Sequence, residues 1–366
     1  MKTALFDYDL PAELIAQRPA AFRDASRLLV VDRRSKSVSH HVFSDLPAHL
    51  RSGDCLIRNK ARVLPARLLA RRVPGGGRVE CLLLRPAGGP SMQWWCLLRP
   101  GRKLPPGTRF GLPGEFEAVV CEKSASAEYR VEFMPERTSE SVVALAERLG
   151  RLPLPPYVER ASLDAGGGPG PEAGDRERYQ TVFADPAHTV AVAAPTAGLH
   201  FTDSLIANLV AGGVTFADVI LHVGLGTFRP IESEEISEHP IHRERVEIPA
   251  ATLSVLEQPC PGHRIAVGTT SLRTVEHYAM DRPGSRPPDA DYRAEADLFV
   301  RPPYQFKLID ALITNFHLPR STLLCLVAAF LTPGSTDGVA WWREIYAEAL
   351  RERYRFLSYG DAMLIL

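Results

Sequence analysis

Four short polar loops, each following an apolar stretch typical of a strand, carry the residue types that could do chemistry. They read "PTAGLHF" (195–201), "HVGLGTF" (222–228), "GTTSLRT" (268–274) and "TNFHLP" (314–319). Glycines let the backbone approach a ligand closely, while hydroxyls, amides and imidazoles form hydrogen bonds to sugars and bases. The candidate substrate-binding residues are Thr196, Gly198, Gly224, Gly226, Thr227, Thr269, Thr270, Ser271 and Asn315.

Three histidines lie in or beside these loops: His200, His222 and His317. An imidazole changes its charge near neutral pH, so each is a candidate for acid–base catalysis. The alternative for each is a structural hydrogen bond in the core. His317 is singled out because Pro319 fixes the entry into the next helix and so holds the loop in one shape.

The sequence contains no motif that supports a covalent mechanism or a metal centre. The nucleophile elbow G-x-S-x-G, the Walker motif and G-x-G-x-x-G are all missing from a suitable context. His239 and His242 lie three residues apart with Glu244 nearby, but Pro240 disfavours a helix through that point. Since no cysteine or third histidine is close to them, we predict no bound metal ion.

The elements that must position the four loops follow an α/β pattern. Apolar segments precede every loop, and helical segments begin near 202, 271 and 321 after the first, third and fourth. The carboxyl ends of strands meet the amino ends of helices at one edge of such a sheet, where ligands bind. We therefore expect the four loops to converge on one pocket.

Residues from about 54 to 143 have a different pattern, with short β-type runs separated by Gly and Pro. Such regular short strands are typical of a small barrel or sandwich. We predict an α/β protein in two domains. The barrel-like α/β catalytic domain comprises 1–58 and 150–366, and a smaller all-β barrel is inserted over 59–149.

The overall charge excludes a nucleic-acid interaction driven by bulk electrostatics, because 43 Lys and Arg residues balance 43 Asp and Glu residues. One local stretch, "RNKARVLPARLLARR" (58–72), is nevertheless basic. It could contact phosphates, or it could be a solvated strand edge. The candidate contacts are Arg58, Lys60, Arg62, Arg67 and Arg71.

The six cysteines are scattered and form no C-x-x-C pair, and the amino-terminal segment lacks a secretory or transit pattern. The longest apolar run, "STLLCLVAAFL", is too short to span a bilayer. We expect a cytoplasmic protein with no membrane partner.

Several of these motifs together resemble one family. "AAPTAGLHF", "LHVGLGTF", "IAVGTTSLR", "DALITNFHLPRSTLL" and the terminal "YRFLSYGDAM" are similar to the S-adenosylmethionine:tRNA ribosyltransferase-isomerase family of queuosine biosynthesis. The amino-terminal "FDYDLPAELIAQRP" and "LPLPPYVER" also match, so the resemblance runs nearly end to end.

The resemblance implies that S-adenosylmethionine is a substrate whose ribosyl group moves to a 7-aminomethyl-7-deazaguanine base at the wobble position of tRNA. The product would be epoxyqueuosine, with adenine and methionine released. It implies no cofactor beyond S-adenosylmethionine. The partners would be that substrate and the tRNA, which makes the basic stretch a candidate tRNA contact, and we expect a monomer. The attacking amine belongs to the substrate, which accounts for the missing protein nucleophile.

The chain departs from the family pattern at Ala61, Arg243 and Pro303. These departures concern acceptor binding more than the core fold, and they would fit a diverged paralogue with an altered acceptor. Two alternative functions are also considered. One is a diverged S-adenosylmethionine- or nucleoside-binding enzyme that acts on a small molecule, which would be favoured if the basic stretch lay far from the pocket. The other is a non-catalytic RNA-binding protein, which would not need four converging loops.

Overall fold

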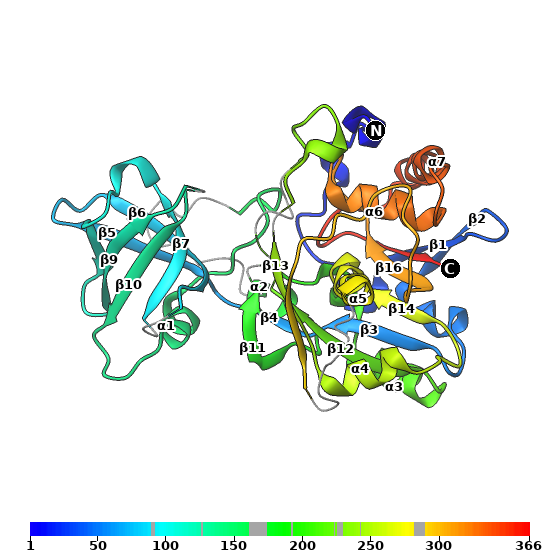
Figure 1. The fold of residues 1–366 in the computed structure, drawn as a ribbon, viewed down its shortest axis with the longest axis horizontal. Helices are drawn as coiled ribbons and strands as arrows, with labels where there is room; N and C mark the ends of the chain where they lie inside the picture. Colours follow the sequence, from blue (N-terminus) through cyan, green and yellow to red (C-terminus); the bar gives the residue numbers. More distant parts are fainter. Residues whose placement is uncertain are drawn as a thin grey trace.

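A computed structural model describes residues 1–88, 92–125, 127–160, 174–191, 193–222, 224, 230–241, 243–281 and 290–366. A small barrel extends from one side of a larger α/β body, and the chain between them is narrow (Figure 1). Both termini lie in the larger body, far from the barrel (Figure 1). The two parts have separate hydrophobic cores.

A nine-stranded mixed sheet forms the centre of the larger body, in the order β15-β13-β12-β3-β14-β16-β17-β1-β2. Its middle strands β12, β3, β14 and β16 run parallel, and β16 pairs with β17 in the antiparallel direction. The strands are β1 (Arg27–Asp32), β2 (Ser37–Val42), β3 (Cys55–Asn59), β12 (Thr215–Leu221), β13 (Glu244–Ile248), β14 (Arg264–Val267), β15 (Tyr292–Ala296), β16 (Ala311–Asn315) and β17 (Ala362–Ile365).

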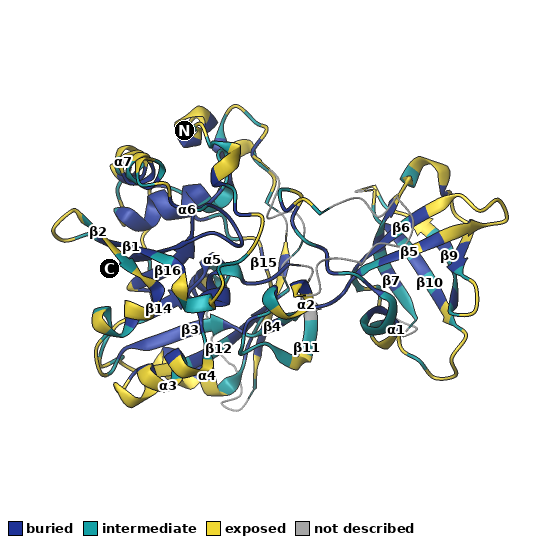
Figure 2. Cartoon of the chain, turned by 180° about the vertical axis from the view of Figure 1, so that it is seen from behind, coloured by how far each residue is buried: buried dark blue, intermediate teal, exposed yellow. Residues whose placement is uncertain are grey.

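The two faces of this sheet are covered by different helices. In β1, Leu29 and Val31 face a core shared with α5, α6 and α7, whereas Leu28 and Val30 face a core shared with α3, as the alternation of side chains along a strand requires. Helix α6 is buried along most of its length, and α7 outside it presents an exposed face (Figure 2). The helices are α3 (Asp203–Ala211), α4 (Ala250–Glu257), α5 (Thr269–Asp281), α6 (Thr322–Leu331) and α7 (Gly338–Arg351).

The smaller part is a closed six-stranded barrel in the order β10-β7-β6-β5-β8-β9. Its strands alternate buried and half-buried side chains, as in β9 and β10, so one face of each strand fills the interior. The strands are β5 (Arg67–Val73), β6 (Arg78–Pro86), β7 (Gln93–Arg99), β8 (Arg109–Leu112), β9 (Phe116–Lys123) and β10 (Tyr129–Pro135), and α1 (Val142–Leu149) packs against β5 and β10.

Short elements connect the two parts. β4 (Ala61–Val63) pairs in parallel with β11 (Asp185–Ala191), and the one-turn α2 (Asp175–Arg178) precedes β11. At the return from the barrel, a Cβ on Gly150 would stand only 1.7 Å from the carbonyl oxygen of Pro65. The chain can pass there only with glycine. The described 3-10 helices are η1 (Thr3–Phe6), η2 (Ala12–Leu14), η3 (Arg23–Ala25), η4 (Phe43–His49), η5 (Gly101–Lys103), η6 (Thr196–His200) and η8 (Ile236–Glu238).

The prediction of an α/β protein with an additional all-β barrel is confirmed at this level. The larger sheet has an open strand order among the described residues, with β15 and β2 at its edges, so its barrel-like closure is not seen there. The domain limits of 1–58 with 150–366, and of 59–149, stay a prediction. Within the described residues, every helix is too short or too polar to cross a bilayer.

Candidate functional site

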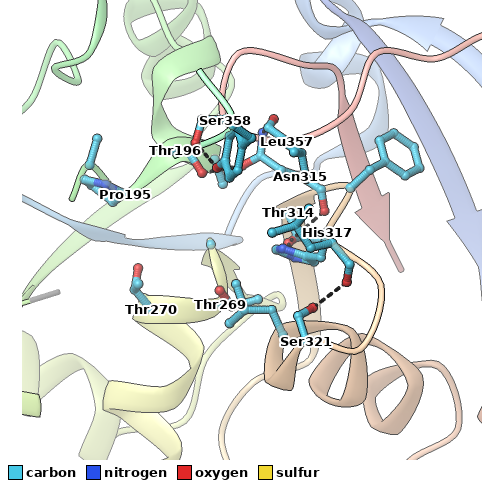
Figure 3. A pocket seen from close by; sticks show the side chains of 17 residues that line it. Pro195, Thr196, Thr269, Thr270, Thr314, Asn315, His317, Ser321, Leu357 and Ser358 are labelled. Carbon is cyan, nitrogen blue, oxygen red and sulfur yellow. Dashed lines mark hydrogen bonds between the residues drawn. The ribbon is translucent and has the colours of Figure 1, made fainter. Parts of the chain in front are cut away.

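One pocket opens where three of the four polar loops come together (Figure 3). It encloses about 660 Å³ of space free of protein atoms, part of it continuous with solvent. Its polar lining comprises Tyr157, Thr196, Thr269, Thr270, Thr314, Asn315, His317, Ser321 and Ser358.

Neighbouring parallel strands bring these residues together. β14 ends at Val267, and α5 begins at Thr269 after a single residue, Gly268. Gly268 has a φ of +91°, which side chains disfavour, and its N–H bonds to Ile313 O on the adjacent β16 at 2.8 Å. β16 itself ends at Asn315. Thr269, Thr270 and Asn315 therefore face one another across the pocket as the strand pattern predicts (Figure 3).

A hydrogen-bonded network fixes the amide of Asn315. Thr196 Oγ1 donates to Asn315 Oδ1 at 2.8 Å, so Asn315 Nδ2 is the group that faces His200 Nε2 at 3.3 Å and Leu357 O at 3.4 Å. Because an amide nitrogen only donates, His200 Nε2 accepts and Nδ1 carries the proton. His200 Nδ1 then donates to Ser26 Oγ at 2.7 Å.

His200 stands behind this network and does not line the pocket. Its side chain is buried, and burial, followed by the charges of Arg355 and Arg23, lowers the pKa of His200 to about 3. It is neutral at physiological pH, as its two opposite hydrogen bonds require. The geometry gives His200 the role of orienting Asn315.

His317 lines the pocket, in agreement with the sequence analysis. Its ring Nε2 lies 2.8 Å from Thr314 Oγ1. Its backbone N–H donates to Tyr346 Oη at 3.1 Å, and its backbone carbonyl accepts from Tyr8 Oη at 2.5 Å. Burial lowers the pKa of His317 to about 3. A neutral imidazole can form a hydrogen bond with a substrate, but at neutral pH His317 does not carry the additional proton of an imidazolium.

The remaining predicted residues of these three loops differ in their surroundings. Thr270 Oγ1 is buried beside the pocket and has no hydrogen-bond partner within the described ranges, which leaves it available for a ligand. Ser271 is fully buried, and its hydroxyl donates to the backbone oxygen of Val267, four residues earlier, at 2.9 Å. Its hydrogen bond is therefore local and structural. Gly198 is a packing residue, because a Cβ there would lie 2.6 Å from the Phe183 ring.

The fourth loop contributes no described residue to this pocket. Gly226 and Thr227 lie outside the described residues. His222 bonds through its N–H to Arg245 O at 3.0 Å, and burial followed by the Arg245 charge lowers its pKa. Gly224 N–H donates to Glu244 Oε1 at 3.1 Å. The catalytic role of His222 stays a prediction.

Three of the five basic candidates are held by carboxylates. Arg58 lies 2.6 Å from Asp218, Lys60 lies 3.0 Å from Asp185, and Arg62 lies 2.5 Å from Glu147. The Arg58 guanidinium is also packed between the rings of Phe183 and Phe216. These contacts favour a structural role for the three.

The other two basic candidates lie on β5 of the barrel. Arg67 is 3.6 Å from Glu80 and is partly exposed. Arg71 is exposed and bonds only to the backbone oxygen of Gly76 among the described residues. Arg71 is therefore the best placed of the five for a phosphate contact.

Sequence reasoning missed the carboxyl-terminal side of the pocket. Leu357, which has a φ of 71°, and Ser358 line it next to Tyr157, and Ser358 Oγ lies 2.7 Å from Tyr157 Oη. A non-glycine residue at positive φ is strained and often marks a functional site. These residues lie in two motifs quoted above for the family resemblance, "YRFLSYGDAM" and "LPLPPYVER", but neither motif by itself indicated that their side chains line a pocket. Within the described ranges, no group of three or more His, Cys, Asp or Glu residues is arranged to hold a metal ion, and His242 lies outside those ranges.

Comparison with known proteins decides the family. Residues 3–365 match the family described as "Queuosine biosynthesis protein". The chain belongs to this family. A relative from Thermotoga maritima named S-adenosylmethionine:tRNA ribosyltransferase-isomerase is 44% identical, with 100% of both chains covered. One of the same name from Rubrobacter xylanophilus is 46% identical, over 100% of this chain and 98% of its own length.

A solved structure supports the same assignment to the queuosine biosynthesis family. The crystal structure of S-adenosylmethionine tRNA ribosyltransferase from Thermotoga maritima aligns with 99% of this chain and 100% of its own. The TM-score is 0.52 and the sequence identity is 35%. The resemblance inferred from the motifs is thus confirmed over the whole chain.

Proposed function

We propose that this chain is an S-adenosylmethionine:tRNA ribosyltransferase-isomerase. It transfers and isomerises the ribosyl moiety of S-adenosylmethionine onto 7-aminomethyl-7-deazaguanine at the tRNA wobble position, and it releases adenine and methionine. The observation that carries the proposal is full-length identity of 44–46% to relatives of that name. A small-molecule enzyme and a non-catalytic RNA-binding protein are not favoured, because neither accounts for this match.

The pocket suits a reaction in which the substrates supply the reacting groups. Its described lining contains hydroxyls, an amide and an imidazole, but no Asp, Glu, Lys, Arg or Cys. Loss of adenine requires hydrogen bonds to the departing base, and formation of the epoxide requires removal of a proton from the ribose methylene beside the sulfonium. Fixed hydrogen-bonding groups can stabilise both steps.

We assign the described residues as follows. Thr196, Thr269, Thr270 and Asn315 bind the nucleoside part of the substrate, and His317 donates or accepts a hydrogen bond there as a neutral imidazole. His200 acts through Asn315 and is a positioning residue. The neutral state of both histidines matters, because the substrate sulfonium is positive and an imidazolium beside it would be repelled.

We propose that tRNA binds the barrel as well as the pocket, and that Arg71 and Arg67 on β5 contact its phosphates. We propose that it is an inserted domain over 59–149, since its strands close on one another and its core is separate. The protein would act in the cytoplasm as a monomer, without a metal ion or redox cofactor.

The test is mass spectrometry of tRNA after incubation with S-adenosylmethionine. The proposal expects the mass of epoxyqueuosine on tRNA that carries 7-aminomethyl-7-deazaguanine, with adenine and methionine in equal amounts. Matched tRNA with guanine at the wobble position is the control. Turnover of S-adenosylmethionine without any mass gain on tRNA would support the small-molecule alternative instead.

A further inference from the structure

A second pocket adjoins the first and is lined by charged side chains. Leu323, in the first turn of α6, lines both pockets. Arg273 lines the second pocket and follows Thr269 of the first by four residues on α5, a rise of about 6 Å on the same helix face. The other residues of the second pocket are His239, Ile241, Glu244, Leu298, Phe299, Val300, Thr322 and Leu326.

Arg273 is only 12% exposed, and part of its hydrogen-bonding capacity is unused. Its Nε donates to Leu298 O at 3.3 Å, and its Nη1 donates to Glu244 Oε2 at 2.5 Å. Its Nη2 is shielded from solvent and has no hydrogen-bond partner among the residues that the structure describes. A buried donor without an acceptor is costly, and more so on a charged group, so native structures seldom leave one unless a ligand completes the site.

Glu244 holds the guanidinium of Arg273 in one orientation. The Glu244 side chain is 5% exposed, and its Oε1 accepts the Gly224 N–H at 3.1 Å while Oε2 accepts from Arg273. Both carboxylate oxygens are thus engaged. Two of the three guanidinium nitrogens of Arg273 are thus held by protein partners, and the third, Nη2, is left over.

We propose that this second pocket binds the amino-acid end of S-adenosylmethionine, with the substrate carboxylate accepting hydrogen bonds from Arg273 Nη2. The inference rests on the function proposed above and extends it. The first pocket has no charged group in its described lining, whereas an amino-acid end carries one negative and one positive charge. Among the described residues, the adjoining pocket has an arginine and a carboxylate in its lining.

A tRNA phosphate is the competing occupant of the same anion site. Arg273 is 12% exposed and stands beside a buried carboxylate. A phosphodiester inside a polynucleotide chain cannot enter such an enclosed position without its neighbours, whereas the free end of a small molecule can. The geometry therefore favours the substrate carboxylate.

The test compares two substrates on two proteins, with saturating tRNA. For the unaltered protein, kcat/KM for decarboxylated S-adenosylmethionine should be about 10- to 100-fold lower than for S-adenosylmethionine, the usual value of a charge-assisted hydrogen bond. In the double variant Arg273→Gln with Glu244→Gln, which keeps a neutral pair of similar shape, that ratio should fall to within about threefold. The matched control is Arg351→Gln with Glu348→Gln, which removes an ion pair of 2.6 Å on the exposed α7; its ratio should stay unchanged.

Several outcomes would overturn the inference. Equal kcat/KM values for the two substrates with the unaltered protein would show that no protein group binds the carboxylate. This measurement does not depend on whether a variant folds. A ratio unchanged in the folded Arg273→Gln, Glu244→Gln protein would make Arg273 structural. In a separate titration of tRNA, a changed KM for tRNA together with an unchanged substrate ratio would assign the site to phosphate. Failure of the proposed function itself is distinct, since the unaltered protein would then form no epoxyqueuosine from S-adenosylmethionine.

Discussion

Thr196 Oγ1 donates a hydrogen bond of 2.8 Å to Asn315 Oδ1 across 119 residues of sequence. This bond joins the loop before α3 to the end of β16 and determines which way round the Asn315 amide lies. It also determines the tautomer of His200, because the amide nitrogen is left to face His200 Nε2. One contact therefore sets the donor and acceptor pattern on one wall of the pocket.

Replacing His200 should reduce activity according to whether the new side chain can accept a hydrogen bond from Asn315. His200→Leu leaves one amide hydrogen of Asn315 unpaired, and we expect kcat/KM to fall about tenfold for a loss of about 1.4 kcal/mol. His200→Gln supplies an acceptor and should keep most of the activity. Steady-state kinetics of both variants check this, and equal losses in the two would contradict a positioning role.

His317→Ala should lower kcat by about 10²- to 10³-fold, the value of one preorganised hydrogen-bonding group, while the melting temperature stays near normal. The neutral imidazole adds no ionisation to the kcat profile between pH 6 and 8. Thr314→Val is the companion variant, since it keeps the imidazole and removes the hydroxyl that bonds to His317 Nε2. A sharp fall in melting temperature with normal turnover of the folded protein would make His317 structural.

The two buried histidines should make the protein sensitive to acid. The pKa values of His200 and His317 are lowered to about 3, so in the folded protein both stay neutral while the unfolded chain binds protons below about pH 6.5. Their stabilising effect is complete above pH 6.5 and is lost as the pH falls toward 3.

Urea unfolding measures this dependence. Below pH 6.5 each histidine should lower the free energy of unfolding by about 1.4 kcal/mol per pH unit. In the His200→Gln variant, the slope of the free energy of unfolding against pH should be smaller than in the unaltered protein by the contribution of one histidine. Parallel curves for the two proteins would show that His200 binds a proton while folded.

Arg67→Ala with Arg71→Ala should weaken tRNA binding and reduce its dependence on salt. Each lost phosphate contact lowers the slope of log affinity against log salt concentration by about 1. Filter binding at several salt concentrations gives the slope. Arg351→Ala, on α7 of the other part of the molecule, is the control, and an unchanged slope in the double variant would leave these arginines as a solvated strand edge.

Gly150→Ala should destabilise the return from the barrel. The added Cβ would stand 1.7 Å from Pro65 O and 2.5 Å from Ala146 O, both of them backbone atoms that cannot rotate away. We expect a loss of about 1–3 kcal/mol in the free energy of unfolding, as for other overpacked sites. Gly77→Ala is the matched control because its Cβ would meet nothing within 4 Å. Equal stability of the two variants would show that the chain relaxes freely at residue 150.

The sequence by itself predicted the elements and three of the loops that form the pocket. Buried strands read as continuous apolar runs, and the residues that follow them must lie at the carboxyl edge of the sheet. Thr270, Asn315 and His317 could be placed there for that reason. Thr196 reaches the pocket differently, because the strand before it, β11 (Asp185–Ala191), pairs with β4 outside the nine-stranded sheet. The barrel was also visible, because Gly and Pro punctuation between short strands is a local signal.

Only the tertiary structure decided which of these side chains face the pocket and with what charge. His200 and His317 both follow strands, yet His200 lies behind Asn315 while His317 lines the site. The sequence made Arg58 a candidate phosphate contact. In the fold, its Nε donates to Asp218 Oδ1 at 2.6 Å, although the two residues are 160 positions apart. Local patterns fix backbone conformation, whereas the ionisation, partners and exposure of a side chain depend on groups that only folding brings near.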